Sequence, residues 1–313
     1  MRIAALSIDL DEIPCYAAIH GLTPPADDVA HAVYRHAVPR FEALLDELGI
    51  RATFFAIGSD LDDAGAAATI ARLHHAGHEI ANHSYSHRYD FSQGSREAIR
   101  ADVARGRDAI AAVTGEAPVG FRAPGYNVVN AVFDALVELG VTYDSSVFPC
   151  PAYYGARAAA IAWIRARGRH SRSIVGNVGV LRAPADPYRA GRPYWRRGHS
   201  TLELPIGVTR DATGRLPFIG TSLVLSGPAR AAWLTRRIVG RPLVNLELHG
   251  IDLADSDEDG LGFLAGHQPD LRHPVSHKRA SLVAAVTALR DAGYTFVTLR
   301  EAAARFDAPT RTA

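Results

Sequence analysis

Cysteine is scarce in this chain, which carries only Cys15 and Cys150 among its 313 residues. Two thiols cannot form a disulfide framework and are too few for a cysteine-based zinc site, so a bound metal would need histidine and carboxylate ligands. The reducing cytoplasm is therefore the expected compartment. Lysine is rarer still, because Lys278 is the one lysine among 34 basic side chains.

The chain also lacks an excess of charge of either sign. Its 34 basic and 33 acidic side chains give a formal charge of +1. The chain therefore lacks the large positive charge by which proteins attract nucleic acid, and we expect no nucleic-acid partner. No stretch approaches the roughly 20 apolar residues that span a bilayer. Asp9 and Asp11 interrupt the first apolar run before a signal-peptide core forms, so we expect no export by the chain's own sequence.

Short apolar runs alternate with alanine-rich helical segments, which favours an α/β architecture with parallel strands and helical crossovers. No linker separates two complete patterns, so we expect one barrel-like domain over residues 1–313, with residues 146–198 as a surface insertion. The expected strands cover residues 3–10, 51–57, 79–82, 119–124, 141–144, 201–204, 242–249 and 294–298. The expected helices cover residues 31–48, 64–76, 95–114, 131–139, 229–238 and 279–292.

Two aspartates follow the first expected strand, in the segment Ser7-Ile-Asp-Leu-Asp11. Residues two apart on a strand point to one face, so Asp9 and Asp11 should project together at the strand's carboxyl end, where parallel α/β folds place active sites. Two carboxylates there repel each other unless a cation or a proton intervenes. The alternative is that one caps the next turn and the other is solvated.

Two histidines four residues apart, His83 and His87, follow the expected strand at 79–82. At this spacing they should stand on one face of a helical turn and can hold one metal ion through neutral imidazoles. The alternative is two surface histidines among the 14 in the chain. Together with the aspartate pair, they predict a site of two histidines and one carboxylate that leaves positions open for water and substrate.

A third strand end carries the segment Phe121-Arg-Ala-Pro-Gly-Tyr126. Pro124 and Gly125 should force a turn. This turn should direct Arg122 and Tyr126 toward the same end of the barrel as the aspartates and histidines. The alternative interpretation makes Arg122 a surface ion-pair partner.

A later strand ends in Leu246-Glu-Leu-His-Gly250, which places His249 at its carboxyl end with Glu247 on the same face. The alternative is that His249 is a core histidine whose ring nitrogens are hydrogen-bonded within the protein. Taken together, the four segments predict one site at the carboxyl ends of the strands.

These four segments resemble, in order and spacing, the motifs of the polysaccharide deacetylases of carbohydrate esterase family four. The resemblance covers roughly residues 3–300, with 146–198 unmatched. It implies a distorted (β/α)7 barrel and a divalent metal held by Asp11, His83 and His87. Zinc is the first expectation, with cobalt, manganese and nickel as alternatives.

The resemblance also implies roles for the other residues. Asp9 would be the general base and His249 the acid that protonates the departing amine, while Arg122 would position or tune Asp9. Tyr126 would offer its backbone N–H to the developing oxyanion. Pro124 and Glu247 are expected at the substrate. The reaction implied is hydrolysis of an N-acyl group, acetyl or formyl, from an amino sugar.

The chain departs from the common family pattern in two places. Leu10 separates the two aspartates, a form that resembles the branch containing the deformylase of undecaprenyl-phosphate-linked formamido-arabinose. The usual aspartate that orients the catalytic histidine has no clear equivalent, and Glu203 and Glu247 are the nearest candidates.

The insertion bears on the substrate, because residues 156–172 mix apolar and arginine side chains, as do residues 233–238. Such segments can lie in a membrane interface and attract anionic headgroups, or form an ordinary helix with a solvated arginine face. We take as a hypothesis a lipid-linked amino sugar, presented at the inner face of the membrane. The polar loop at 252–277 is interpreted as a lid over the sugar site or as a solvated loop, without a catalytic residue.

Two other function classes remain open. A metal-independent amidohydrolase of a small nitrogenous ring compound, similar to an allantoinase, would keep its activity after chelation. A non-catalytic glycan-binding module would lose at least one catalytic position, and none is lost here. The oligomeric state is not indicated by the sequence.

Overall fold

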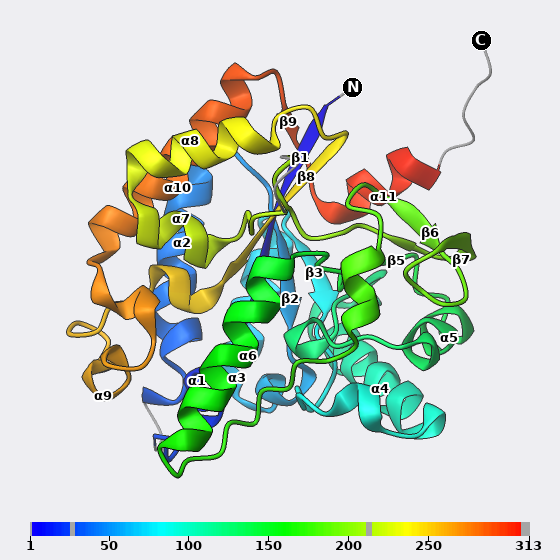
Figure 1. Ribbon diagram of the computed structural model, residues 1–313, viewed down its shortest axis with the longest axis horizontal. Coiled ribbons are helices and arrows are strands. Elements are labelled where there is room, and N and C mark those ends of the chain that lie inside the picture. Colours follow the sequence, from blue (N-terminus) through cyan, green and yellow to red (C-terminus); the bar gives the residue numbers. More distant parts are fainter. Residues whose placement is uncertain (1, 26–28, 211–214, 308–313) are drawn as a thin grey trace.

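A strongly curved, largely parallel sheet forms the centre of the computed structural model, which describes residues 2–25, 29–210 and 215–307 (Figure 1). The strand order is β6-β7-β5-β4-β3-β2-β1-β8, with β9 pairing with β1, and only β6 runs antiparallel to its neighbour. The strands are β1 (Ile3–Asp9), β2 (Thr53–Ala56), β3 (Glu79–Asn82), β4 (Gly120–Phe121), β5 (Tyr143–Asp144), β6 (Tyr188–Ala190), β7 (Arg197–Glu203), β8 (Leu243–His249) and β9 (Thr295–Phe296).

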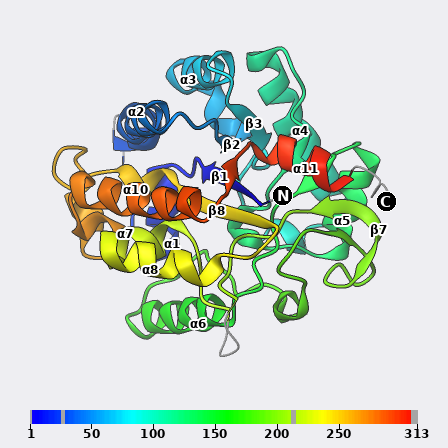
Figure 2. The ribbon, with the colours of Figure 1, turned by 90° about the horizontal axis from the view of Figure 1, so that it is seen from above.

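Helices surround the sheet, as the view from above shows (Figure 2). They are α1 (Ile13–His20), α2 (Val38–Leu48), α3 (Ala64–His75), α4 (Arg96–Thr114), α5 (Asn130–Glu138), α6 (Pro151–Ala166), α7 (Gly220–Ser226), α8 (Pro228–Ile238), α9 (Gly262–Ala265), α10 (Val275–Asp291) and α11 (Leu299–Asp307). The chain after β7 returns to β8, where the Gly207 N–H donates to the Asn245 carbonyl oxygen at 2.8 Å. The sheet thus curls toward closure, and the expected distorted (β/α)7-type barrel is confirmed.

Strand β1 shows how the pattern of apolar residues divides the core. All seven of its residues are buried. Ala4, Leu6 and Ile8 belong to the large cluster formed with the outer helices, whereas Ile3 and Ala5 belong to the cluster that includes α11. Because side chains alternate along a strand, Ser7 and Asp9 continue the second set and face the inside of the barrel.

Most predicted helices and strands are present with boundaries shifted by a few residues. Gly49 ends α2 in the left-handed conformation, and the Ser95 hydroxyl accepts the Ala98 N–H at the start of α4. The segment at 146–198 is only partly a surface insertion, because β6 lies within it and pairs with β7. Helices α1, α7, α9 and α11 were not expected, and α6 was expected only as one of two alternatives for residues 156–172. The start signal of α11 was missed: Thr298 and Glu301 form a capping box in which each side chain accepts the backbone N–H of the other.

None of the helices in the described ranges combines the length and the apolar character needed to cross a membrane. This agrees with the absence of a long apolar run in the sequence.

The single lysine holds the loop that follows β8. Lys278, on α10, is fully buried, and its ammonium donates to the carbonyl oxygen of Ala254 at 2.5 Å. We expect Lys278→Met to lower the free energy of unfolding by about 1–3 kcal/mol, because that carbonyl loses a charged donor in the interior. Urea unfolding measures the loss. Arg279→Met, which removes the neighbouring exposed ion pair with Glu47, should cost only about 0–1 kcal/mol, and equal losses in both variants would contradict this role of the lysine.

Candidate active site

The carboxyl ends of β1 and β8 bring two predicted site residues side by side. The two strands pair in parallel from Ile3 with Leu243 to Asp9 with His249. Asp11 lies just beyond the end of β1 rather than on it, and both aspartates are buried. The strand direction therefore sets Asp9 and His249 at the end of the barrel that Figure 1 shows near α1.

The two predicted histidines lie on an irregular loop after β3 and not on a helical turn. Ser84 and His87 adopt left-handed backbone angles, with φ of 66° and 45°. The loop packs against Gly106 of α4, where an added Cβ would come within 2.7 Å of the Ser84 backbone. The expectation of a helical turn is thus wrong, because tight packing on α4 fixes two residues in a conformation that a helix does not allow.

Asp11, His83 and His87 nevertheless converge in space. The Nε2 atoms of His83 and His87 lie 3.3 and 3.2 Å from Oδ1 of Asp11, and ligand atoms of all three residues fall within 4.8 Å of one another. The Nδ1 atom on the other side of each ring also has a partner. Nδ1 of His83 donates to the Arg122 carbonyl oxygen at 2.7 Å, and Nδ1 of His87 lies 3.4 Å from Sγ of Cys15. Support of this kind orients the imidazoles of metal sites.

The donor set of this cluster fits a divalent cation. Oδ1 of Asp11 and Nε2 of His87 are buried, and neither has a hydrogen-bond partner beyond the contacts within the cluster itself. Although burial alone would raise it, the two histidines hold the pKa of Asp11 well below its usual range. Burial opposes the charged ring, yet Asp11 and Cys15 raise the pKa of His87 to about 10. The cluster therefore attracts positive charge, and two histidines with one carboxylate can bind a metal ion with open positions.

Asp9 sits beside this cluster but has a different partner. Its Oδ1 accepts the Nη1 donor of Arg122 at 2.5 Å, and its Oδ2 lies 3.8 Å from Nε2 of His83. Burial raises the pKa of Asp9 even though Arg122 and His83 lower it. The two aspartates thus have pKa values displaced in opposite directions, which is typical of a pair with separate chemical roles.

Arg122 is fully buried and held in one orientation. Its Nε donates to the Ser145 carbonyl oxygen at 2.8 Å, its Nη2 donates to the hydroxyls of Ser7 and Ser145, and the guanidinium stacks over the Phe55 ring at 4.1 Å. The interpretation of Arg122 as a surface ion-pair partner is thereby excluded. Ser7 could have been found from the sequence, because it lies two residues before Asp9 on the same strand face.

His249 lies across the cleft from the histidine cluster and contacts Glu247. Its Nδ1 is 2.8 Å from Oε1 of Glu247, and its Nε2 is 3.4 Å from the Tyr126 hydroxyl. Burial favours the neutral ring, but Glu247 raises the pKa of His249 well above its usual range. Of the two candidates for orienting His249, Glu247 is therefore the one in contact. Glu203 is instead beside Asp144 and accepts the Val147 N–H.

A second acidic group, formed by Asp9, Glu247 and His249, also has ligand atoms within 4.8 Å of one another. The Arg122 guanidinium contacts Asp9 there, and the Glu247 carboxylate faces the His249 ring. The fixed positive charge of Arg122 on Asp9 disfavours a second cation in this group.

A cleft of about 330 Å³ joins these residues to the surface. Asp9, Asp11, His83, Tyr126 and His249 line it, whereas the other predicted site residues, His87, Arg122, Pro124 and Glu247, do not. Pro124, in a 3-10 turn, and Glu247, in contact with His249, are buried and do not reach the cleft in this conformation. Their contact with substrate stays a prediction. The remaining lining residues include Tyr16, Tyr89, Tyr153, Arg157, Ser173 and Thr221. Tyr153, Arg157 and Ser173 lie in the 146–198 segment that was expected to bear on the substrate, whereas the sequence did not indicate the other three.

The turn that carries Tyr126 differs from the expected arrangement in one detail. The Tyr126 N–H, to which the resemblance assigns the oxyanion, donates to the Ala123 carbonyl oxygen at 3.0 Å. Tyr126 has a φ of 60°, and its side chain faces His249. In this conformation the hydroxyl, rather than the backbone N–H, reaches the reacting region.

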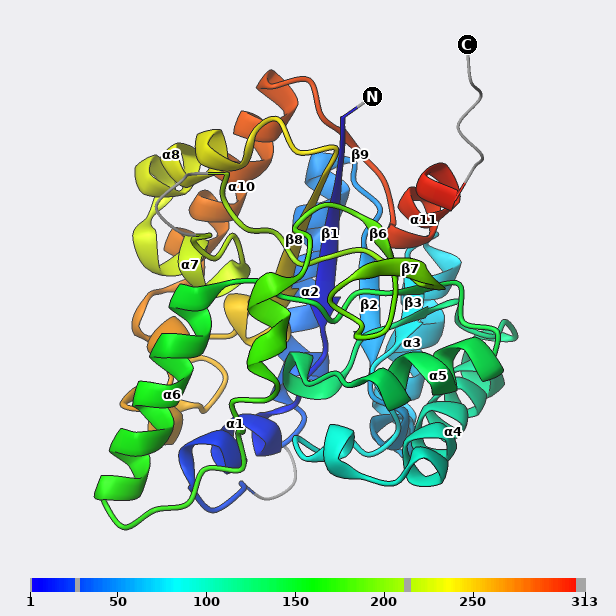
Figure 3. The same ribbon diagram turned by 45° about the vertical axis from the view of Figure 1, so that its right-hand side comes forward.

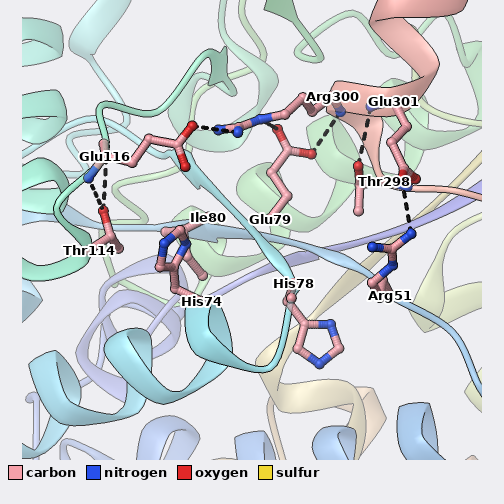
Figure 4. A pocket seen from close by; sticks show the side chains of 11 residues that line it. Arg51, His74, His78, Glu79, Ile80, Thr114, Glu116, Thr298, Arg300 and Glu301 are labelled. Atoms are coloured by element: carbon pink, nitrogen blue, oxygen red, sulfur yellow. Dashed lines mark hydrogen bonds and ion pairs between the residues drawn. The ribbon is translucent and has the colours of Figure 1, made fainter.

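Another cavity, of about 230 Å³, lies at the opposite, amino-terminal end of the strands (Figure 4). Its carboxylates are matched by arginines, with Arg300 contacting Glu116 and Arg51 contacting Glu301. Glu79, at the start of β3, accepts from Tyr143 and from the Arg300 backbone. None of the predicted site residues lines this cavity, and its paired charges indicate a structural role.

Comparison with known proteins points to one family. Residues 27–143 match the family model described as polysaccharide deacetylase. A peptidoglycan deacetylase of Helicobacter pylori is 26% identical over 148 residues, which are 46% of this chain and 49% of that protein. The chain thus matches about half the length of this curated relative. These findings support the resemblance to the polysaccharide deacetylases.

Solved structures agree on the fold. A protein from Mycobacterium smegmatis assigned to the polysaccharide deacetylases superposes with a TM-score of 0.56 at 20% identity, covering 97% of this chain and 90% of its own. A family 4 acetyl xylan esterase from Clostridium thermocellum, in complex with a cobalt ion, gives a TM-score of 0.51 at 19% identity and covers 98% and 93%. At these identities the matches establish the fold.

Proposed function

We propose that this chain, whose residues 27–143 match the polysaccharide deacetylase family, hydrolyses the N-acyl amide of an amino sugar with the help of a divalent metal ion. The observation that carries the proposal is the convergence of the His83 and His87 Nε2 atoms on Oδ1 of Asp11. Asp11 and His83 line the same cleft as Asp9 and His249. A base, an acid and a cation site in one cleft are the groups that amide hydrolysis needs.

Asp11, His83 and His87 would hold the metal, with zinc as the first candidate. A divalent ion there would supply Lewis acidity and would lower the pKa of a water molecule toward neutral pH. The cobalt ion in the acetyl xylan esterase that shares this fold supports a divalent metal at this site.

Asp9 is proposed as the general base. Its Oδ2 faces His83, while its Oδ1 is fixed by Arg122, so a single oxygen is free to accept the proton of the attacking water. The raised pKa of Asp9 makes it a better proton acceptor than an exposed aspartate. Arg122 contributes by fixing this geometry.

His249 is proposed as the general acid. Expulsion of an amine from a tetrahedral intermediate needs a proton on nitrogen, and a protonated Nε2 on the cleft side of His249 can supply it. Glu247, behind the ring at Nδ1, favours the charged imidazolium and sets its orientation. The Tyr126 hydroxyl, 3.4 Å from Nε2, lies where it can contact the substrate.

The pH profile should report the pair formed by Glu247 and His249. Because Glu247 raises the pKa of His249, the acid stays protonated to higher pH, and activity should fall only as pH rises through that raised value. We expect Glu247→Gln to move the alkaline limb of the kcat profile to lower pH. Thr298→Ala, distant from the cleft at the start of α11, serves as the control and should leave the limb in place. An unchanged limb in Glu247→Gln would contradict the assignment.

The substrate is proposed to carry an acetyl group, in line with the deacetylase names of the related proteins. A formyl group is the second candidate, supported by the separation of Asp9 and Asp11 by Leu10. We further propose that the sugar is joined to a lipid. Support comes from α6, where Trp163 is 52% exposed and the Arg167 guanidinium stacks on its ring at 3.8 Å. Aromatic and arginine side chains of this kind suit a membrane interface.

Release of acetate or formate from a panel of soluble and lipid-linked N-acyl amino sugars tests this function. Chelator-stripped protein should be inactive and should recover with zinc or cobalt. Activity that survives chelation would instead favour hydrolysis of a small ring amide without a metal. No turnover of any amino sugar by metal-loaded protein would refute the proposed reaction.

A further inference from the structure

A side pocket of about 180 Å³ adjoins the cleft, between the end of α1, α6 and the segment around α9. The two cavities share four lining residues, Ile19, Arg157, Ala160 and Ser173. Figure 3 shows α6 alongside α1, with the chain after α6 returning past both helices. A substrate whose acyl group reaches the histidine cluster can therefore extend into this pocket.

The walls of the side pocket differ sharply in character. One part is apolar and contains Ile19, Ile161, Trp163 and Ile164. The other part is cationic and contains Arg157, Arg169 and Arg272. No carboxylate side chain is among the described residues that line it, whereas the inner end of the cleft holds Asp9 and Asp11. The charge thus changes sign along the path from the reacting end to the side pocket.

Arg157 stands where the two cavities meet and has a fixed orientation. Its Nη1 donates to the Gly125 carbonyl oxygen at 2.8 Å and its Nε donates to the Ser173 hydroxyl at 2.9 Å. Both acceptors are neutral, so these bonds orient the guanidinium without compensating its charge. In the described part of the chain, no carboxylate forms an ion pair with Arg157, Arg169 or Arg272.

The sequence around α6 reinforces this imbalance. Residues 145–185 contain no aspartate or glutamate, but they contain Arg157, Arg165, Arg167, Arg169, Arg172 and Arg182. Uncompensated guanidinium groups beside a low-dielectric wall produce a local positive potential, which attracts an anion. The planar fork of arginine matches the paired oxygens of a phosphate or carboxylate.

We propose that the side pocket binds an anionic group of the substrate, a phosphate or a carboxylate, together with the first part of an apolar chain attached to it. The inference rests on the proposed function for the placement of the sugar in the cleft. The arginines hold the anion, and Ile161 and Trp163 contact the apolar chain. The pocket would thus select amino sugars that carry a negative charge on the side away from the acyl group.

Calorimetric binding to the full chain tests the pocket without turnover. The probes are inorganic phosphate and three octyl compounds, octyl phosphate, octanoate and octyl glucoside, each used below its critical micelle concentration. We expect one of the two anionic octyl compounds to bind at least tenfold more tightly than octyl glucoside and than inorganic phosphate, and the tighter of the two identifies the anion. Equal binding of the neutral compound would overturn the anion site, and equal binding of inorganic phosphate would overturn the apolar wall.

Substitutions locate the binding. Arg157→Met and Arg272→Met should each weaken binding of the preferred probe at least fivefold, and Arg272 is exposed, so its loss should not disturb folding. Arg165→Met is the matched control, because Arg165 lies on the same helix and lines neither cavity. If Arg157→Met and Arg272→Met weaken binding no more than Arg165→Met, the proposal is wrong.

The same samples separate this inference from the function on which it rests. Probe binding with no deacylation of any amino sugar would count against the proposed reaction alone. Deacylation of amino sugars without selective binding of an anionic octyl compound would overturn the side pocket alone.

Discussion

Asp9→Asn is expected to lower kcat for an N-acyl amino sugar by about 10²- to 10⁴-fold, the range that general base catalysis contributes. Asparagine keeps the size of the side chain and can still accept a hydrogen bond from Arg122, but it cannot take a proton from water. Steady-state kinetics with metal-loaded protein measures the loss. One zinc ion should still bind, because the predicted ligands Asp11, His83 and His87 are unchanged.

The control for this variant must separate chemistry from folding. Arg122 is fully buried, so removing the charge of Asp9 leaves a guanidinium without its carboxylate, and some stability will be lost. A thermal melt and the zinc stoichiometry show whether the variant is folded. Asp108→Asn, on the exposed face of α4, should have normal activity. A folded, zinc-binding Asp9→Asn protein with near-normal kcat would remove Asp9 from the mechanism.

His249→Gln is expected to lower kcat for amide substrates by about 10²- to 10⁴-fold, because the departing amine loses its proton donor. The effect should depend on the leaving group. 4-Nitrophenyl acetate releases a weakly basic phenolate that needs no protonation, so its hydrolysis should be much less affected by the substitution. Parallel assays of the two substrates with the same metal-loaded samples measure the difference.

The comparison between substrates is its own control, since misfolding or loss of metal would reduce both activities alike. His199→Ala, which replaces a histidine outside the cleft on β7, should leave both activities unchanged. An equal loss for amide and activated ester in His249→Gln would assign His249 to a step before the leaving group departs.

Much of the site could be predicted because it depends on strand direction and on residue alternation. Asp9 and His249 each end a buried strand, and adjacent parallel strands in register place them together. Arg122 follows β4 in the same way. These placements need only the pattern of apolar runs and the polar residues that end them, whereas the contact between Arg122 and Asp9 was expected from the family resemblance.

Other features could not be read from the sequence because they arise from packing over long distances. The loop from His83 to His87 takes left-handed angles at Ser84 and His87 because it packs against α4. Cys15 reaches His87 only through the position of α1, a helix that the sequence pattern did not indicate. The pairing of β6 with β7 depends on a segment without regular alternation.

The roles of the residues in the histidine cluster rest on the claim that Asp11, His83 and His87 bind a metal. A calorimetric zinc titration of chelator-stripped protein, with wild type and His87→Ala in parallel, tests it most directly. His75→Ala, on the exposed end of α3, is the matched control. We predict one tight site in wild type and in His75→Ala, weakened at least about tenfold in His87→Ala, since even the loss of a supporting residue costs about 10- to 100-fold. No binding by wild type, or equal affinity in all three proteins, would contradict the metal centre.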